Sequence, residues 1–317
     1  MPNIQHTIVQ NVKFLLKKIR QISSIPKQEK VAHKLEAYIV DFQRGEIPHY
    51  GTVAKKPELV GKKIIWQYWH QGVSEQTSKI VAACLTSVQQ HKGECEVIVL
   101  NKNTVWDYIT LPDFVFEKLD KNGFRLAELS NLIRLNLLSA YGGVWLDATM
   151  YLTAPIPEVL LKSDFFAFQR TNTLPPDAAM FLKFDPLYFS WNPRFLAAML
   201  NAFMVAVPHH KIVDDLLSIL LEYWKREEKI GQYYLFQICF NRMMQHKEWR
   251  ELNCEITGDT DCHRLQIVAM QPFNKKLFDE ITAQSTIHKL TYRFDKLNQI
   301  PEGSFFDYIA NEKIEME

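Results

Sequence analysis

Short apolar runs typical of buried strands alternate along most of the chain with longer runs of helical periodicity. These runs predict strands at residues 62–69, 96–100, 144–152 and 165–169, with further strands near 265–270 and 286–293, and helices at 78–91, 112–119, 126–141, 194–206, 211–228 and 232–245. Because strands that alternate with helices form mainly parallel sheets, we expect an α/β domain whose sheet is flanked by helices.

Two helices are predicted before this domain, at residues 4–22 and 26–44. The first has an apolar face and a basic flank. That flank could rest on an anionic membrane near a lipid-linked acceptor, or the helix could dock on the rest of the protein with its basic face in water. Residues 46–61, which hold two prolines and two glycines, are typical of a linker. We therefore divide the chain into a helical N-terminal extension at 1–60 and a domain at 61–317.

The composition excludes several classes of protein. A net charge of +1 over 317 residues gives no case for nucleic acid as a partner. The five cysteines are scattered without close pairs, which indicates reduced thiols in a cytosol. No secretion signal is visible at the amino terminus, and the longest apolar stretch, 195–207, is interrupted by Asn201 and too short to span a membrane. We expect a cytoplasmic protein, with any membrane contact peripheral and at the inner face.

The predicted helix at 126–141 is apolar nearly all round, which is typical of a buried helix. Its polar residues form a notch in which Asn131 and Arg134 share one face, with Ser130 beside them. A buried guanidinium without an anion is costly, so Arg134 needs a partner. The candidate partners are Glu128, Asp147 and a ligand phosphate. A plain ion pair would be the simplest answer, but the residues after the helix favour a ligand.

The helix ends at Gly142 and Gly143, and the next predicted strand carries one acid, Asp147. A glycine at a helix end is commonplace, but two in a row also allow a ligand close to the backbone. Aspartate is disfavoured inside strands, so Asp147 is expected at the strand's end, facing a ligand or a metal. Such helix–turn–strand junctions hold phosphorylated ligands in α/β proteins. One carboxylate could suffice for a divalent ion bound to a diphosphate.

The run LSNLIRLNLLSAYGGVWLDAT, at residues 129–149, resembles the donor-site signature of bacterial capsular polysaccharide synthesis proteins. These proteins are relatives of glycosyltransferase family 32 and, more distantly, of the large clostridial glucosylating toxins. The resemblance covers residues 62–157 well, including KKIIWQYWHQG, and continues more weakly to IHKL at 287–290. It implies a nucleotide-sugar-binding fold of the GT-A type, with the donor bound by residues 61–157 and the acceptor by 158–317.

The resemblance also implies roles for single residues. Asp147 matches the first acid of the D-x-D motif, which binds the donor's ribose and the metal, and Arg134 matches an arginine that contacts the donor. Trp69 matches an aromatic residue that stacks on the base. His288 resembles a late metal-ligand histidine, against the simpler interpretation of a core or surface histidine, and Lys289 is a candidate to bind the leaving diphosphate.

The chain departs from the family pattern at two positions. Asn131 stands where much of the family has aspartate, and Thr149 where the wider superfamily has the second acid of D-x-D. The asparagine removes a carboxylate that would hold the donor sugar. With Ser130 and Gly143, Asn131 completes the expected donor site.

Together these features predict a glycosyltransferase that moves a hexose from a nucleoside diphosphate sugar, UDP-linked, to a glycan acceptor with the help of Mn²⁺ or Mg²⁺. The resemblance implies that the anomeric configuration is retained. The acceptor would contact Gln169, Arg170, Asp185 and Trp191. Asn131 and the missing second acid also suit a non-catalytic subunit of a capsule-assembly complex. A third possibility, a phosphotransferase acting on a glycan, would release UMP.

Overall fold

The computed structural model describes residues 4–121, 123–186, 188–293 and 300–311, with the backbone alone at 4–21. The strands are β1 (Ile64–Tyr68), β2 (Glu96–Leu100), β3 (Gly143–Leu146), β4 (Met150–Leu152), β5 (Phe165–Gln169), β6 (Met199–Ala206) and β7 (Ile287–Lys289). The helices are α1 (Ile4–Gln43), α2 (Lys79–Gln90), α3 (Asp113–Asp120), α4 (Leu126–Tyr141), α5 (Glu158–Leu161), α6 (Ala178–Phe184), α7 (Lys211–Arg226), α8 (Leu235–Met243), α9 (Lys247–Arg250), α10 (Arg264–Val268), α11 (Lys275–Gln284) and α12 (Phe305–Ala310), with short 3₁₀ helices at Pro57–Leu59, Thr104–Asp107 and Asp261–His263.

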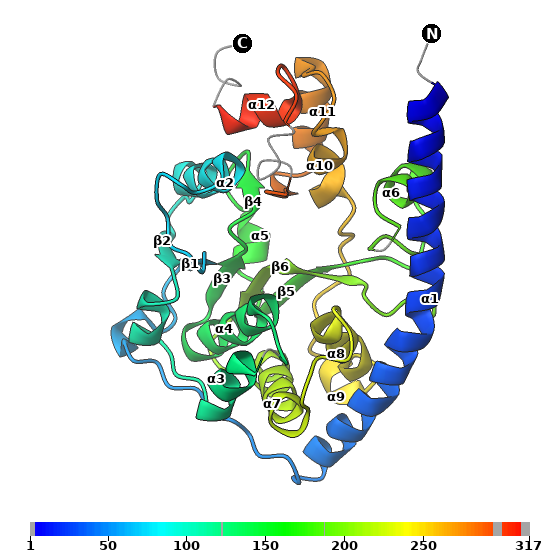
Figure 1. Ribbon diagram of the computed structural model, residues 1–317. Coiled ribbons are helices and arrows are strands. Elements are labelled where there is room, and N and C mark those ends of the chain that lie inside the picture. Colours follow the sequence, from blue (N-terminus) through cyan, green and yellow to red (C-terminus); the bar gives the residue numbers. More distant parts are fainter. Residues whose placement is uncertain (1–3, 122, 187, 294–299, 312–317) are drawn as a thin grey trace.

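Among the described residues, a five-stranded sheet in the order β2-β1-β3-β6-β5 lies at the centre of the molecule (Figure 1). Strands β2, β1 and β3 are parallel, β6 runs antiparallel to β3, and β5 runs antiparallel to β6. Four of these strands therefore point the same way, which confirms the predicted mixed, mainly parallel sheet. Strands β4 and β7 pair separately, in antiparallel orientation.

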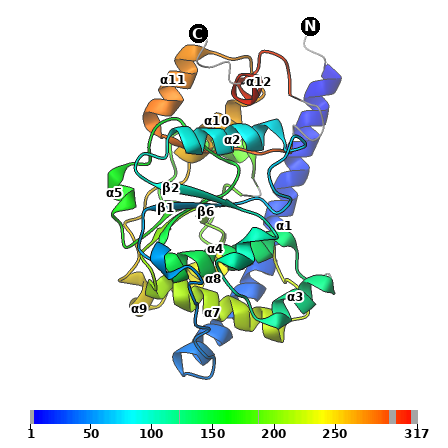
Figure 2. The ribbon, with the colours of Figure 1, turned by 90° about the vertical axis from the view of Figure 1, so that its left-hand side faces the viewer.

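Helices cover both faces of the sheet (Figure 2). Because successive side chains of a strand point to opposite faces, Ile64, Trp66 and Tyr68 pack into the core with α1, α4, α7 and α8. Ile65 joins a second cluster on the opposite face. Beyond that cluster, α2, α10, α11 and α12 enclose a third. This layering leaves the ends of the strands as the places where polar groups can gather.

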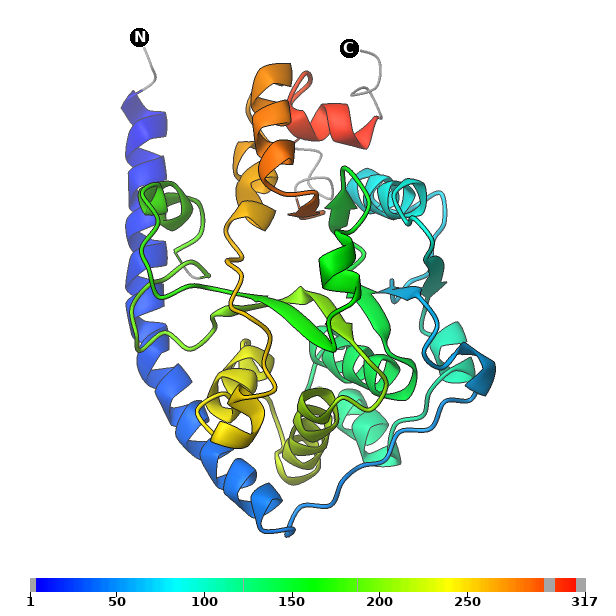
Figure 3. The same ribbon diagram turned by 180° about the vertical axis from the view of Figure 1, so that it is seen from behind.

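The amino-terminal segment is one helix, α1, where two were predicted (Figure 3). Pro26 lies inside it. A proline removes one helical hydrogen bond, but the residue four positions earlier, Ile22, is exposed, so water can satisfy the freed carbonyl. Leu35 and Ile39 are fully buried against the main core, where α1 packs on α7 and α8. The division of the chain at residue 60 stays a prediction, and the side chains of the predicted basic flank lie outside the described residues.

Three sequence predictions of local structure are wrong. The predicted strand at 144–152 is two strands in different sheets, β3 and β4, separated by a turn at 147–149. The predicted helix at 194–206 is largely the strand β6, because pairing with β3 and β5 overrides the helical preference of its alanines, leucines and methionines. The predicted strand near 265–270 is the helix α10, a short apolar run whose periodicity does not distinguish the two.

Within the described residues, no helix has both the length and the apolar character needed to cross a bilayer.

Candidate functional site

Asp147 follows directly after β3, at the carboxyl end of the parallel strands. The chain reverses at Gly142, so α4 and β3 run in opposite directions. Arg134 lies eight residues before this turn, about 12 Å along the helix, and Asp147 lies five residues after it, about 16 Å along the strand. The fold-back therefore brings the two side chains together at the same edge of the sheet.

Asp147 is the centre of a set of charged contacts. Its Oδ1 accepts hydrogen bonds from Arg134 Nη2 and from Trp145 Nε1, both at 2.8 Å. Its Oδ2 lies 3.8 Å from Lys289 Nζ. We call Arg134, Asp147 and Lys289 the charged cluster. Glu128, the other acid considered for Arg134, is engaged instead by Arg125 at the start of α4.

The members of the charged cluster differ in exposure. The side chain of Arg134 is 3% exposed, while those of Asp147 and Lys289 are 28% and 23% exposed. The guanidinium lies over the rings of Trp145 and Phe236, at 4.9 and 5.6 Å from their centroids. Arg134 therefore holds Asp147 in place from inside, and Asp147 and Lys289 are the groups that a ligand could reach.

The electrostatics of the charged cluster favour an ionised carboxylate. Burial raises the pKa of Asp147, but the charges of Arg134 and Lys289 outweigh this effect and hold the pKa below its ordinary value. Burial lowers the pKa of Arg134 and of Lys289, and the negative charge of Asp147 opposes that change in both. An anion bound beside Lys289 would further favour its ammonium form.

A chain of amides extends from Arg134 into the second half of the protein. Arg134 Nη1 donates to Asn131 Oδ1, which also accepts from Asn201 Nδ2 at 3.0 Å, and Gln237 Nε2 donates to Asn201 Oδ1 at 3.2 Å. Neither Asn201 nor Gln237 was predicted to belong to the site. Asn201 could have been noticed as a polar residue inside the apolar run of β6, but that pattern does not identify its hydrogen-bond partners.

Lys289 reaches the site from a distant part of the chain. Its Nζ donates to Thr149 Oγ1, the position of the missing second acid. The backbone fixes this contact, because Lys289 is opposite Met150 in the β4–β7 pair and Leu290 N–H donates to Thr149 O at 2.9 Å. An ammonium is thus held between the two positions that a D-x-D motif would give to acids.

The donor groups around Asp147 do not fit a divalent cation. A metal bridging positions 147 and 149 would displace the ammonium of Lys289 from Thr149 Oγ1. A double and a single positive charge about 4 Å apart repel by about 8 kcal/mol at an effective dielectric constant of 20. Within the described residues, no group of three or more histidine, cysteine, aspartate or glutamate side chains could hold a metal. The expected Mn²⁺ or Mg²⁺ therefore stays a prediction that these residues do not favour.

His288, the second predicted metal ligand, faces away from Asp147. Neighbouring residues of a strand point to opposite faces, and it is Lys289 that points to Asp147. His288 is fully buried, with Nε2 3.2 Å from Thr153 Oγ1, and Nδ1 has no partner in the described part of the chain. Burial lowers its pKa to about 4. This geometry is that of a core histidine.

Trp69 lies at the same edge of the sheet as Asp147, because β1 and β3 pair in parallel with Trp66 opposite Trp145. Its ring is partly exposed and contacts the ring of Tyr292 edge-on, at 5.4 Å between centroids. Ser130 is also partly exposed, on α4. The contacts of Trp69 and Ser130 with a donor stay predictions.

Gly143 lies at the opposite end of β3 from Asp147. It begins β3, about 13 Å of strand from Asp147, so the structure gives no support to its predicted contact with the donor. A Cβ at Gly143 would lie 2.5 Å from the carbonyl oxygen of Ile64, and its φ is +95°. The glycine is therefore required for β3 to pack beside β1.

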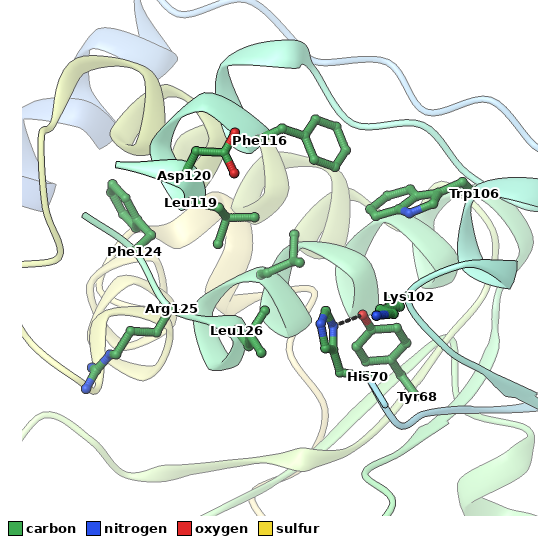
Figure 4. Close-up of a pocket in the computed structure, with 11 residues that line it drawn as sticks. Tyr68, His70, Lys102, Trp106, Phe116, Leu119, Asp120, Phe124, Arg125 and Leu126 are labelled. Atoms are coloured by element: carbon green, nitrogen blue, oxygen red, sulfur yellow. Dashed lines mark hydrogen bonds between the residues drawn. The ribbon is translucent and has the colours of Figure 1, made fainter. Parts of the chain in front are cut away.

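A cavity of about 590 Å³ opens beside α4 at the same edge of the sheet (Figure 4). Its walls are mostly apolar and aromatic, with polar groups at intervals. The lining residues are Tyr68, His70, Lys102, Trp106, Phe116, Leu119, Asp120, Phe124, Arg125, Leu126 and Leu129. Tyr68 and His70 hydrogen-bond to each other at 2.8 Å. Leu126 shares one helical face with Ser130 and Arg134, and Arg134 lies about 12 Å further along α4.

Two of the four predicted acceptor residues, Gln169 and Arg170, lie at the end of β5, two strands from β3, and both are buried. Gln169 is buried and pairs with Asn253. Arg170 is buried too and makes two hydrogen bonds to Asp259, at 3.3 and 2.6 Å, beneath the rings of Tyr188, Phe189 and Trp191. Asp185 follows the end of α6. Gln169 and Arg170 therefore stabilise the fold and present no polar group to a substrate.

Fold and site together define an α/β protein with a charged cluster at the carboxyl edge of its sheet. A family model described as capsular polysaccharide synthesis protein matches residues 13–309. The chain belongs to this family, as the run at 129–149 predicted.

No curated protein matches the chain. Among solved structures, the PaToxG glycosyltransferase matches with 11% identity and a TM-score of 0.38, over 96% of this chain and 94% of that one. That TM-score is too low for a shared fold to be inferred from it.

Proposed function

We propose that the protein is a glycosyltransferase with a fold of the GT-A type, which moves a hexose from a nucleoside diphosphate sugar, UDP-linked, to a glycan of a bacterial capsular or surface polysaccharide. The observation that carries this proposal is the charged cluster at the carboxyl edge of the sheet, in a chain that belongs to a capsule-synthesis family. Ligands of open α/β sheets bind at that edge.

In the proposed reaction, the bond between the sugar's anomeric carbon and the diphosphate oxygen breaks, and its electron pair stays on the diphosphate. An acceptor hydroxyl bonds to the anomeric carbon, and its proton passes to the oxygen of the leaving diphosphate. Negative charge therefore builds on the leaving diphosphate, and positive groups fixed beside it lower the barrier. We propose that the anomeric configuration is retained.

Each member of the site has a role in this reaction. Lys289 donates to the diphosphate, while Asp147 accepts from the donor's ribose. Arg134 holds Asp147 and adds positive charge from beneath. The base stacks on Trp69, and Asn131 and Ser130 contact the hexose.

The acceptor approaches from the side of residues 158–317. We propose that it is lipid-linked and that residues 4–22 bring the protein to the inner face of the membrane. Sedimentation of the protein with vesicles of anionic lipid, compared with neutral lipid, tests this contact. Equal sedimentation with both would argue against it.

The activity is tested by incubating the protein with a panel of UDP-sugars and measuring released UDP, with MnCl₂ and separately with EDTA. We expect slow donor hydrolysis in the wild type and its loss in Asp147→Asn, which keeps the shape of the side chain. UMP in place of UDP would indicate a phosphotransferase. No product under either condition would contradict the proposal.

Asn131 and Thr149, which stand where relatives carry acids, favour a second candidate, a non-catalytic nucleotide-sugar-binding subunit of a capsule-assembly complex. A ligand that binds only the folded state raises the melting temperature. A UDP-sugar that raises it without any turnover, even with acceptor glycans added, would favour the subunit.

A further inference from the structure

An ammonium occupies the position at which a sugar-nucleotide enzyme with a D-x-D motif would hold its metal. Lys289 Nζ donates to Thr149 Oγ1 and lies 3.8 Å from Asp147 Oδ2. The lysine thus contacts both residues that correspond to the two acids. An ammonium has three donors and no acceptor, so at least one donor stays available for a ligand.

The contact is a fixed part of the fold. Thr149 and Lys289 are 140 positions apart, yet the β4–β7 pair sets them side by side, and Leu290 N–H donates to the carbonyl of Thr149. Lys289 is partly exposed, so its charge is held at the surface of the site and not sealed in the core.

The formal charges of Asp147, Thr149 and Lys289 sum to zero without a metal ion, and a divalent cation would add two positive charges. Two carboxylates with a divalent cation sum to zero. Asp147, the neutral Thr149 and the ammonium of Lys289 also sum to zero, and Arg134 adds one positive charge in either case. Replacing the second acid by threonine and the metal by lysine therefore preserves the net charge that faces a diphosphate.

We propose that Lys289 takes the place of the divalent cation, so that the protein binds the diphosphate of its donor and supports transfer without a metal ion. This inference rests on the proposed function and specifies its chemistry. Lys289 carries the charge that opposes the leaving diphosphate, and Thr149 positions it. The ammonium acts as a hydrogen-bond donor and a fixed positive charge, and no proton transfer is required of it.

The first test measures the affinity of the folded protein for UDP and for GDP by isothermal titration calorimetry, in EDTA and in MgCl₂ or MnCl₂. We expect the same affinity in all three conditions. Lys289→Met, which keeps length and removes charge, should weaken binding by about 10- to 100-fold in EDTA. The matched control is Lys276→Met, on the exposed face of α11, which should bind as the wild type does.

The second test restores the second acid and removes the lysine, so that a metal ion could bind. The double variant Thr149→Asp with Lys289→Ala rebuilds two acids and removes the ammonium. We expect it to bind UDP weakly in EDTA and to recover affinity when MnCl₂ is added, while Lys289→Ala alone recovers less. Circular dichroism confirms that each variant is folded.

The outcomes separate this inference from the function on which it rests. Nucleotide binding by the wild type that requires Mn²⁺ or Mg²⁺, or that survives Lys289→Met unchanged, would overturn the role of Lys289 and leave the glycosyltransferase proposal standing. Absence of nucleotide binding in every condition would overturn both.

Discussion

Replacing either member of the pair Arg134–Asp147, in which the guanidinium is buried, should destabilise the fold, and the effects of the two replacements should not be additive. The pair is joined at 2.8 Å, and the guanidinium is 3% exposed. Breaking a buried pair costs about 3–5 kcal/mol, because it leaves one charge without compensation. The perturbations are Arg134→Met and Asp147→Asn, both close in shape to the native side chains.

The surroundings of the pair predict which variant suffers more. In Arg134→Met, Asp147 is partly exposed and keeps Lys289 at 3.8 Å, so we expect a loss of about 2–3 kcal/mol. In Asp147→Asn, Arg134 stays buried without an anion, and its hydrogen bond to Asn131 is with a neutral oxygen, so we expect a loss of about 3–4 kcal/mol. The double variant removes both charges and should cost about 2 kcal/mol less than the sum of the single losses.

Urea unfolding followed by circular dichroism measures these differences, provided that the slope of the transition is unchanged among the four proteins. Additivity within about 0.5 kcal/mol would show that the two charges do not stabilise each other and would refute the reasoning. A larger loss in Arg134→Met than in Asp147→Asn would refute the role given to Lys289 as a second partner of the carboxylate.

Three further predictions concern the site, the packing of the sheet and the protein's interior. Trp69→Leu should weaken UDP binding by about tenfold in calorimetry, because a stacked base contributes about 1–3 kcal/mol. Unchanged binding would mean that the base binds elsewhere, for example in the 590 Å³ cavity. Gly143→Ala should lower the unfolding free energy by roughly 3 kcal/mol. The control is Gly61→Ala, which should cost about 1 kcal/mol, because Gly61 has a similar φ but open space around it. Equal losses would contradict the close approach of the Ile64 carbonyl to Gly143. Burial lowers the pKa of His263 to about 4, so between pH 4 and 6.5 the unfolded chain binds a proton that the folded protein does not. Stability should therefore fall as the pH falls through this window, by up to about 1.4 kcal/mol per pH unit, and His263→Asn should reduce that slope; an unchanged slope would count against the assignment.

The sequence predicted α4 to the residue because two strong local signals coincide there. Leucines surround the axis, and Gly142, at a φ of +72°, ends the helix where an L-residue would be strained. The same stretch places Arg134 and Asp147 on either side of a reversal, so their contact could be predicted from chain geometry. The chemistry between them could be predicted only as one of several alternatives.

The parts that the sequence did not predict depend on contacts between distant segments. The residues of β6 favour a helix when taken alone, and only their place between β3 and β5 makes them a strand. The hydrogen bond from Lys289 to Thr149 joins residues far apart in the chain, and no local pattern links them. Likewise, Arg170 is of a residue type that often contacts substrates. Its ion pair with Asp259 is buried, however, and therefore stabilises the fold.

The most direct test of the metal-free diphosphate site is a crystal structure of the protein with UDP, grown from solutions that contain EDTA. We expect the β-phosphate within hydrogen-bonding distance of Lys289 Nζ, beside Asp147, with the ammonium still on Thr149 Oγ1. Nucleotide bound away from the charged cluster would contradict this expectation. So would a complex that forms only when a metal ion is supplied and shows that ion between positions 147 and 149 with Lys289 displaced.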